Sequence, residues 1–533
     1  MRIYQPVLSI IILSITVLMS SCSEQQADVS NVSETEMRAG QMLLSDNCSG
    51  CHMASEDGTF SRISHMRKTP EGWDMNIARM MIFHGLEIEP DDRRALVKFL
   101  SDTQGLAPSE TAAYRDVLER KHNIIEQDVD PDLAAMCARC HSFARVALQR
   151  RDRQEWQNLV HMHLGQWASI EYQMLARERD WRADALGPVS EKLGRMFPLK
   201  TTDWSDWQAT EWKDMSGEWR MVGHLSGQGD MEGMMQVTAL GSDKYQTEFM
   251  LNENNAILKG TGKSIVHSGY EWRGTAIFAD EKVRQIWAAS PDGNRMTGRF
   301  FRQGHPEEGM EITAWRKIPR SHGIMSIIPS ALRVGVPTEI TISGVNLSGA
   351  VAIAGAVVTV KEASTDRIIL MATAEDTTAG QAKVTVGEDT SALAVYAQVD
   401  YLKIIPEYGI SRVGGGPLAK VKAQFEAVGY SFGPDGLRDT GDDVRLGMVP
   451  VTWATDNYNA AAAAMEDAKY AGEITQKGTF IPAAGGPNPC RKYSTNNAGD
   501  LKVIATYTDG NRTLTAQAHL IATVQRWNNP PIM

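Results

Sequence analysis

The sequence predicts a multidomain chain of the α + all-β class: a helical N-terminal part, an eight-stranded antiparallel β-barrel and two β-sandwiches. From residue 36 to about 200, apolar residues recur three or four positions apart, as on amphipathic helices. From Gly217 the period changes towards two, as on half-buried strands, and turn residues separate the runs. A chain of 533 residues has room for three or four domains of roughly 150 residues each.

The composition is that of an ordinary globular protein. Hydrophobic residues make up 42% and charged residues 22%, which excludes a wholly disordered chain. The net charge is −11 and no Lys/Arg stripe stands out, which argues against nucleic acid as the main partner. Six cysteines are too few for a disulfide scaffold, and four of them form two tight pairs.

The N-terminus is typical of an export signal, which we place at residues 1–22. The uncharged run Val7–Met19 is too short to span a bilayer core, which needs about 20 helical residues. The segment Leu18–Cys22 resembles a bacterial lipobox, so two interpretations stay open: lipidation of Cys22 or simple cleavage near it. Residues 23–35 are polar and predict a flexible tether. Both interpretations place the protein outside the cytoplasm.

Two CxxCH motifs carry the chemistry. They read Cys48-Ser49-Gly50-Cys51-His52 and Cys137-Ala138-Arg139-Cys140-His141. CxxCH is the attachment signature of c-type haem, because two thiols three positions apart reach the haem vinyl groups and the adjoining histidine lies under the iron. We therefore predict covalent haem at both cysteine pairs, with His52 and His141 as the proximal iron ligands.

Zinc or disulfide bonds are the alternatives for the cysteine pairs. A site of four thiolates needs both CxxC pairs at one metal ion. Eighty-five residues separate Cys51 from Cys137, far more than in a zinc ribbon, and a histidine directly follows each pair. The pattern favours two haems.

The segments after the two motifs look like a duplication. Trp73 is followed by five residues and then by Arg79-Met80, and Trp156 is followed by five residues and then by Met162-His163. Aligning the tryptophans places Met80 opposite His163. Both segments have helical apolar spacing, so each helix can present one residue to the open face of its haem. This predicts Met80 as the distal ligand of the first iron and His163 as that of the second.

Other distal ligands remain open at this point. Met81 or His84 could replace Met80, and His161 could replace His163. On an ideal helix Met81 points about 100° away from Met80, so the two cannot face the same iron. A helical methionine can also be core filler.

The predicted ligand difference has a redox consequence. Thioether sulfur stabilises ferrous iron more than imidazole does, so a His/Met haem generally has a higher potential than a bis-His haem. The first haem is then the better electron acceptor. Because neither iron has an open position in this prediction, the expected role is electron transfer without oxygen activation.

The domain boundaries follow from changes in composition. Residues 36–200 predict a dihaem cytochrome c domain, and residues 201–320 an antiparallel barrel that serves as a packing module. Residues 321–400 resemble an IPT/TIG immunoglobulin-like domain, and residues 401–533 predict a second immunoglobulin-like domain. The acidic segment Asp435–Asp443 could bind calcium, although its spacing is not that of an EF-hand and a solvated loop is favoured.

The order of the predicted domains and several local sequence segments together resemble one family. The matching segments are CSGCH, CARCH, the stretch from Trp73 to Met80, GEWRMVGHLSGQGD from Gly217, and YGISRVGGGPLAKVKAQFEAVGYSFGPDG from Tyr408. Beyond the signal, the chain resembles the alpha subunit of quinohemoprotein amine dehydrogenase from end to end.

The resemblance implies a periplasmic heterotrimer with a propeller beta subunit and a small gamma subunit. The gamma subunit would carry cysteine tryptophylquinone and oxidise primary amines, so no catalytic residue is expected in this chain. Two covalent haems c would pass electrons to a cupredoxin or a soluble cytochrome c. Lipidation at Cys22 would depart from the plain periplasmic export that the family implies.

Two other functions remain. One is a lipid-anchored dihaem conduit whose immunoglobulin-like domains bind another partner, with no amine oxidation. The other is a dihaem subunit of a different quinoprotein dehydrogenase. The sequence leaves open the preferred amine, the physiological acceptor and which haem is nearer the quinone.

Overall fold

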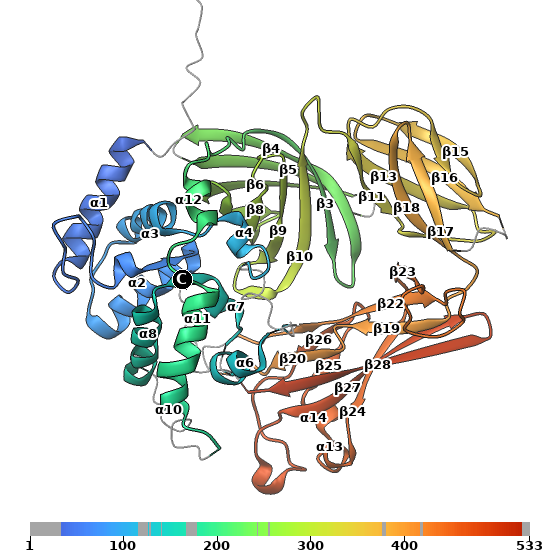
Figure 1. The fold of residues 1–533 in the computed structure, drawn as a ribbon. Helices are drawn as coiled ribbons and strands as arrows, with labels where there is room; N and C mark the ends of the chain where they lie inside the picture. The colour runs from blue at the N-terminus through green and yellow to red at the C-terminus, as the bar shows by residue number, and fades with distance from the viewer. Residues whose placement is uncertain are drawn as a thin grey trace, which may run out of the picture.

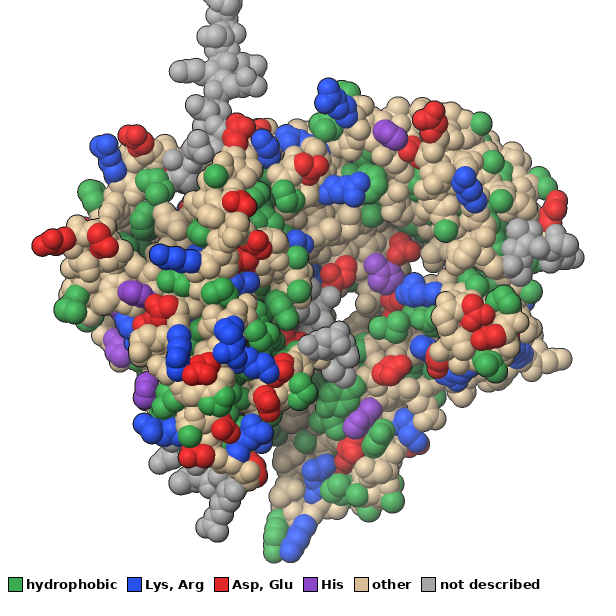
Figure 2. Space-filling view, viewed as in Figure 1, with side chains coloured by type: hydrophobic (Ala, Val, Ile, Leu, Met, Phe, Trp, Pro, Cys, Tyr) green, Lys and Arg blue, Asp and Glu red, His purple; other side chains and the backbone are tan. Residues whose placement is uncertain are grey.

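The computed structural model describes residues 33–115, 126, 129–139, 141–166, 178–241, 243–253, 256–375, 380–415 and 419–524. The predicted fold class is confirmed: a helical domain is followed by a closed eight-stranded barrel and by further β-sheet domains. Figure 1 shows the helical domain beside the barrel, the third domain on the other side of the barrel and the fourth domain below them. Figure 2 shows a hollow where the helical domain, the barrel and the fourth domain meet.

The first lobe of the helical domain holds the first CxxCH motif. Its elements are α1 (Glu34–Cys48), η1 (Ile63–His65), β1 (Met66–Lys68), α2 (Pro70–His84) and α3 (Pro90–Gln104). Helix α1 begins two residues before the expected boundary, because Ser33 and Glu36 form a capping box. Helix α2 begins after the N-cap Thr69 and ends at Gly85, which has a φ of 71° that suits glycine.

The second lobe holds the second CxxCH motif. Its elements are α6 (Pro131–Cys137), α7 (Ala144–Ala147), β2 (Gln149–Arg151), α8 (Arg153–Gln166), α10 (Trp181–Asp184), η2 (Ala185–Val189) and α11 (Ser190–Met196). Asp130 caps α6 by accepting from the backbone amides of Asp132 and Leu133, both at 3.1 Å. Helices α4 (Pro108–Thr111) and α12 (Thr202–Gln208) lie next to each other near the junction of the lobes and the barrel (Figure 1).

The two lobes are joined by a two-stranded sheet that periodicity did not predict. Strand β1 pairs with β2 in antiparallel register, with Arg67 opposite Arg150. Trp73 and Trp156 lie six residues after these arginines, and both indoles are buried in the cores of their lobes. Equivalent segments of the duplication therefore meet around a pseudo-two-fold axis.

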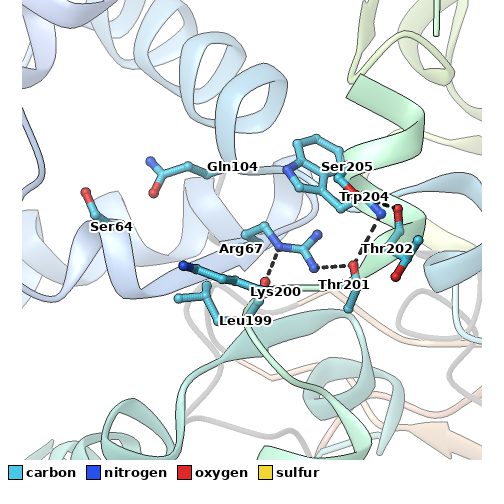
Figure 3. A pocket seen from close by; sticks show the side chains of 9 residues that line it. All are labelled: Ser64, Arg67, Gln104, Leu199, Lys200, Thr201, Thr202, Trp204 and Ser205. Atoms are coloured by element: carbon cyan, nitrogen blue, oxygen red, sulfur yellow. Dashed lines mark hydrogen bonds between the residues drawn. The ribbon is translucent and has the colours of Figure 1, made fainter. Parts of the chain in front are cut away.

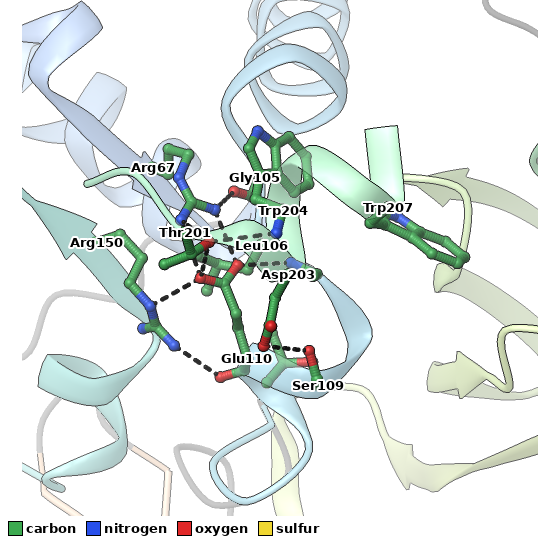
Figure 4. A network of polar contacts seen from close by, with 12 residues as sticks. Arg67, Gly105, Leu106, Ser109, Glu110, Arg150, Thr201, Asp203, Trp204 and Trp207 are labelled. Carbon is green, nitrogen blue, oxygen red and sulfur yellow. Dashed lines mark hydrogen bonds and ion pairs between the residues drawn. The ribbon is translucent and has the colours of Figure 1, made fainter. Parts of the chain in front are cut away.

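One carboxylate bridges the two facing arginines. Glu110 accepts from Arg67 Nη1 and Nη2, both at 2.9 Å, and from Arg150 Nε at 3.0 Å (Figure 4). Thr201 Oγ1 donates a further bond to Glu110 at 3.0 Å. Burial alone would raise the pKa of Glu110, but the bond from Arg67 and the charges of Arg150 and Arg67 outweigh it and lower the pKa.

The barrel is closed by eight antiparallel strands in the order β10-β3-β4-β5-β6-β7-β8-β9. They are β3 (Gly217–Leu225), β4 (Gly229–Gly241), β5 (Lys244–Glu253), β6 (Ala256–His267), β7 (Glu271–Phe278), β8 (Glu281–Ala289), β9 (Arg295–Arg302) and β10 (His305–Arg316). Large side chains such as Trp219, Trp272 and Phe300 fill the core. A cavity lined by methionines, including Met221, measures about 10 Å³, about the space of one water molecule.

The barrel packs firmly on the first lobe through the turn between β6 and β7. The Ser268 amide donates to Asp102 Oδ1 at 2.8 Å, and Trp207 Nε1 donates to the Ser268 carbonyl at 2.7 Å. Arg273 of β7 holds Glu71 of α2 at 2.5 and 3.2 Å. Because these bonds reach both α2 and α3, the barrel fixes the first lobe from one side.

The third domain is a sandwich of two four-stranded sheets, β11-β13-β16-β15 and β12-β18-β17-β14. Its strands are β11 (Gly323–Ile328), β12 (Ala331–Arg333), β13 (Thr338–Val345), β14 (Val351–Ile353), β15 (Ala356–Ala363), β16 (Arg367–Ala374), β17 (Gly380–Val386) and β18 (Asp389–Tyr396). The alternate burial along β16 and β17 shows one face turned to the core, as expected for a sandwich.

The fourth domain contains three sheets, β19-β22-β23, β20-β28-β27-β24 and β21-β26-β25. Its strands are β19 (Tyr401–Ile405), β20 (Tyr408–Arg412), β21 (Ala423–Gln424), β22 (Glu426–Ser431), β23 (Val444–Met448), β24 (Thr452–Asn457), β25 (Gly472–Ile474), β26 (Thr479–Pro482), β27 (Gly499–Asp509) and β28 (Arg512–Thr523), and its short helices are α13 (Ala460–Ala464), α14 (Asp467–Tyr470) and η3 (Lys492–Ser494). The segment 419–432 contains two strands, β21 and β22, which pair in different sheets.

A histidine links the barrel to the fourth domain. His224 Nδ1 lies 2.6 Å from Asp230 Oδ1 on the barrel, and its Nε2 lies 2.6 Å from Glu426 Oε2 on β22. These two bonds, that to Asp230 first, raise the pKa of His224 to about 10. The contact is therefore an ion pair at neutral pH. Its contribution to stability is full below the ordinary histidine pKa of about 6.5 and is lost progressively as the pH rises from there to about 10.

We expect Glu110→Gln to lower the free energy of unfolding of the helical domain by about 3–5 kcal/mol, because it leaves two buried guanidinium groups without their carboxylate. The side chain of Glu110 is only 3% exposed, so water cannot replace the lost charge. Urea unfolding followed by the helical circular dichroism signal measures the change.

The matched control is Glu34→Gln. Glu34 is an exposed partner of Arg38, and its replacement should change stability by less than about 0.5 kcal/mol. A loss below about 1 kcal/mol for Glu110→Gln would show that the pair behaves like a surface ion pair and does not hold the lobes together.

Candidate haem-binding sites

The first CxxCH motif continues the last turn of α1. The amides of Cys51 and His52 donate to the Cys48 carbonyl at 3.2 and 2.9 Å, so the motif forms one tight turn. Cys48 is half-buried against the core of the first lobe, and Cys51 is exposed. Burial, together with the charge of Cys51, raises the pKa of the Cys48 thiol to about 11.

His52 is oriented for a ligand on its outer nitrogen. Its Nδ1 lies 2.8 Å from the carbonyl oxygen of Ser61, which accepts the ring proton. This bond leaves the lone pair on Nε2, the arrangement that metal-binding histidines commonly show. The amide of Met53 donates to Ser61 Oγ at 2.9 Å and closes the loop that holds the ring in place.

Helix α2 carries the three candidate distal ligands of the first site. Met80 and Met81 are half-buried, and His84 is exposed at the end of the helix. Met81 packs against the lobe core, and its sulfur accepts from Arg93 Nη1 at 3.7 Å. Among the described residues, no such donor contacts the sulfur of Met80. The choice between the two methionines stays a prediction. Met80 remains the predicted ligand, because its sulfur accepts no hydrogen bond from the described residues.

The second motif begins at the end of α6. Cys137 is half-buried, and burial raises the pKa of its thiol to about 12. Cys140 lies outside the described residues. The ring of His141 follows the same pattern as that of His52, with Nδ1 2.9 Å from a carbonyl oxygen, that of Ser142.

His141 and His163 lie near each other in the second lobe. Burial, aided by the charges of Arg145, His163 and Arg79, lowers the pKa of His141 to about 4, although its bond to Ser142 favours the charged form. Burial also lowers the pKa of His163, whose Nδ1 lies 2.8 Å from the Leu159 carbonyl. Both imidazoles are thus neutral with a free Nε2, the form that binds iron.

His161, the alternative to His163, is exposed on the other side of α8. His163 is less exposed than His161, and the choice between them as the distal ligand stays a prediction.

The two cysteine pairs belong to different cores. Cys48 packs on the core of the first lobe and Cys137 on that of the second. Both thiols, like the exposed Cys490, are free in the part of the chain that the structure describes. Because the β1–β2 sheet joins the lobes and each pair is followed by its own oriented histidine, the arrangement fits two separate sites.

Buried donors in the second lobe fit an anionic group. Trp156 Nε1 and Trp181 Nε1 are buried and have no acceptor among the described residues, whereas Trp73 donates to the Gln104 carbonyl at 3.1 Å. The guanidinium groups of Arg139 and Arg179 lie 5.2 and 5.0 Å from the centre of the Trp181 ring. A buried donor without an acceptor is costly. Haem, with propionate carboxylates at its edge, suits this set of donors.

One open groove lies away from these residues. It has a volume of about 590 Å³ and opens between η1, the end of α3 and α12, with Arg67, Lys200 and Trp204 on its walls (Figure 3). The guanidinium of Arg67 is already used there by the Leu199 carbonyl at 2.7 Å and by Thr201. None of the motif residues and none of the candidate distal ligands lines this groove. We therefore place the haem sites at the motif residues and not in the groove.

Two acidic clusters lie outside the haem-binding motifs. His305, Glu307 and Glu308 come together on β10, but Lys422 Nζ lies 2.6 Å from Glu308 and already supplies a positive charge. In the loop Asp435–Asp443, the carboxylates accept bonds from backbone amides and from Tyr401, and they do not converge as a ligand group in the described residues. The loop is better described as internally hydrogen-bonded than as a calcium site.

Four family models match successive parts of the chain. They describe the quinohemoprotein amine dehydrogenase alpha subunit: its haem-binding domain matches residues 38–204, domain II residues 213–317, domain III residues 322–397 and domain IV residues 402–532. The chain belongs to the quinohemoprotein amine dehydrogenase alpha subunit family. It is therefore a subunit of an amine dehydrogenase, an oxidoreductase, and its N-terminal domain binds haem.

Other comparisons add little. No curated protein matches the alpha subunit chain significantly. Its solved structural neighbours include a redesigned β-barrel with a TM-score of 0.18, at 12% identity over 20% of this chain and 92% of that one. Another is mouse clustered protocadherin gamma C3, domains EC1–3, with a TM-score of 0.17, at 10% identity over 58% of this chain and 89% of that one. Likenesses this weak carry no argument about the alpha subunit.

Sequence reasoning missed the basic residues of β1 and β2. Arg67 and Arg150, and Lys68 and Arg151, stand at the same distances before the two tryptophans, and all four side chains are buried. Extending the tryptophan alignment backwards would have found this repeat, although not Glu110, which lies outside it. Within the described ranges of this alpha subunit, every helix is too short or too polar to cross a membrane.

For the second site, we expect His163→Ala to convert its haem from low spin to high spin, because a small apolar side chain leaves the distal position open. Absorption and electron paramagnetic resonance spectra of the ferric protein measure the change. His161→Ala is the matched control on the same helix and should leave the spectra unchanged. A purely low-spin spectrum for His163→Ala would contradict the assignment.

For the first site, we expect Met80→Ala to abolish the weak near-infrared methionine-to-iron band of the ferric protein, because alanine has no sulfur. Met81→Ala is the control, since it removes the neighbouring thioether and should keep the band. If the band survives in Met80→Ala and disappears in Met81→Ala, Met81 is the ligand and the tryptophan alignment is off by one residue.

Proposed function

We propose that this alpha subunit is the dihaem electron-transfer subunit of a periplasmic quinohemoprotein amine dehydrogenase. It accepts electrons from a cysteine tryptophylquinone on a partner subunit during the oxidative deamination of primary amines. It passes them to a cupredoxin or a soluble cytochrome c outside the complex. The family match supports the enzyme and haem binding, and the following features support two haems and a relay.

The observation that carries the proposal is the back-to-back pairing of the two lobes. Strands β1 and β2 pair directly, so the lobes with the two CxxCH motifs share one buried junction. Each lobe presents a motif histidine whose Nδ1 is bonded to a carbonyl and a helix with a candidate distal ligand. Haem c, when bound, supplies reversible one-electron chemistry at its iron. Two such sites in rigid contact suit a relay.

Different residues of this chain attach the haems and bind their irons in the proposal. Cys48, Cys51, Cys137 and Cys140 attach the haems, and His52 and His141 bind the irons from the proximal side. Met80 gives the first iron a sulfur ligand, whereas His163 gives the second an imidazole. Sulfur favours the reduced iron, so we infer that the first site has the higher potential and is the later one in the electron path.

The β domains suit subunit docking. The barrel core is filled with side chains, so its role in the proposal is to hold the first lobe through Arg273 and the Ser268 turn. We propose that the immunoglobulin-like domains carry the propeller and quinone-bearing subunits of a heterotrimer. We also propose export to the periplasm, with Cys22, which lies outside the described residues, as a lipidation site or as the neighbour of the cleavage site.

The direct test uses the native complex and a primary amine. Adding n-butylamine to the oxidised complex should reduce both haems, measured as growth of the ferrous absorption bands. This chain alone, with its haems, should show no reduction, because the quinone is on a partner. If no primary amine reduces the haems of a complex that contains all subunits, amine oxidation is wrong for this protein. The lipid-anchored conduit would then replace it.

A further inference from the structure

The open groove beside Arg67 has the size of a binding site. Its volume of about 590 Å³ falls within the range of about 300–1,000 Å³ that is usual for ligand pockets. Its walls are η1, the end of α3, the segment 199–202 and α12 (Figure 3). Because no haem-binding residue lines it, a molecule bound in the groove must be something other than the haem.

The groove carries positive charge although the whole chain is acidic. Two cations, Arg67 and Lys200, stand on its walls, and no aspartate or glutamate is among its lining residues. Lys200 is exposed, and no carboxylate of the described residues lies within 4.0 Å of its ammonium group. The net charge of the chain is −11, so the groove is a local exception. Its charge favours an anionic partner.

Neighbouring acid groups do not cancel this charge. Glu110 binds Arg67 but also Arg150, so these three groups together leave one positive charge at the junction of the lobes. Asp203 of α12 accepts a hydrogen bond from Ser109 Oγ at 2.8 Å and does not line the groove. An acidic group that enters the groove therefore meets a wall whose positive charge is only partly compensated.

An aromatic ring gives the groove an anchor for a protein surface. Trp204 lies half-buried on its wall, and the Arg67 guanidinium is 5.2 Å from the centre of the ring. The polar side chains of Ser64, Gln104 and Ser205 also line the groove (Figure 3). Tryptophan and arginine with a polar rim are typical of protein–protein docking sites.

Two contacts connect the groove with the first haem-binding site. Trp73, in the core on which Cys48 packs, donates to the carbonyl of the groove residue Gln104 at 3.1 Å. Ile63, which packs on the same core, directly precedes the groove residue Ser64. The groove therefore lies on the lobe of the first haem, from which electrons leave in the proposed relay.

We propose that this groove is the docking site of the external electron acceptor, and that the acceptor is a soluble redox protein with an acidic face. An acidic side chain of the acceptor pairs with Lys200, and the surface around it packs on Trp204. Such exposed charge pairs raise the rate of association more than the affinity. The step moves one electron from the reduced first site to the acceptor, and no proton or covalent bond is exchanged. The inference rests on the dihaem function proposed above.

The test follows electron transfer from the purified native complex to plastocyanin, a cupredoxin with an acidic face. The complex is reduced with dithionite and freed of the excess, and stopped-flow absorption then gives the second-order rate constant. The wild-type rate should fall as the ionic strength rises, because salt screens the attraction between opposite charges. Lys200→Glu should lower the rate at low ionic strength at least tenfold and remove most of its salt dependence.

Two further variants separate the groove from the net charge. Ser205→Trp fills part of the groove without changing its charge, and it should also slow the transfer, because the acceptor can no longer seat against Trp204. The matched control is Lys259→Glu, the same change at an exposed lysine of β6 on the barrel. It should leave the rate within twofold of the wild type.

Four results would overturn the docking site. They are a wild-type rate that does not fall with salt, unchanged rates for Lys200→Glu and Ser205→Trp, an equal loss of rate in Lys259→Glu, and release of a subunit by Lys200→Glu in size-exclusion chromatography. The last result would show that the groove seats a partner subunit and not the acceptor. Failure of every primary amine to reduce the haems would instead overturn the proposed function, and it is seen separately because dithionite replaces the amine in this test.

Discussion

The helical domain depends on one constraint: two arginines from equivalent strands face each other in a buried sheet, and a single carboxylate must hold both. Arg67 and Arg150 would repel each other without Glu110. The strands β1 and β2 are too short to hold two lobes by backbone bonds alone. The ionic contact therefore sets how the lobes meet, and with it the separation and orientation of the two oriented histidine rings.

The β domains extend this rigidity beyond the helical domain. The barrel binds α2 and α3 through charged and backbone contacts, and the fourth domain binds the barrel through His224. A relay benefits from such a frame, because the distances between redox centres must not vary from turnover to turnover. The barrel core is filled with side chains, and the small cavity beside Met221 has room for about one water molecule.

Much of this could be predicted from the sequence. The change of period at Gly217 predicts the eight strands, and CxxCH with its fixed spacing predicts the haem-binding residues. What could not be predicted are features made by distant residues. Glu110 has no motif, and the β1–β2 sheet is too short for periodicity to indicate it. The helical phase places Met80 and Met81 about 100° apart, and the choice between them as the iron ligand stays a prediction.

The antiparallel pairing of equivalent strands is also the contact that two separate copies of a one-haem protein would make around a symmetry axis. When both copies are joined in one chain, their sequences no longer have to be identical. Each half can then change independently, as Met80 and His163, which stand at equivalent positions of the tryptophan alignment, already show. A symmetric dimer could only change both halves alike, whereas the fused chain can make its two lobes different.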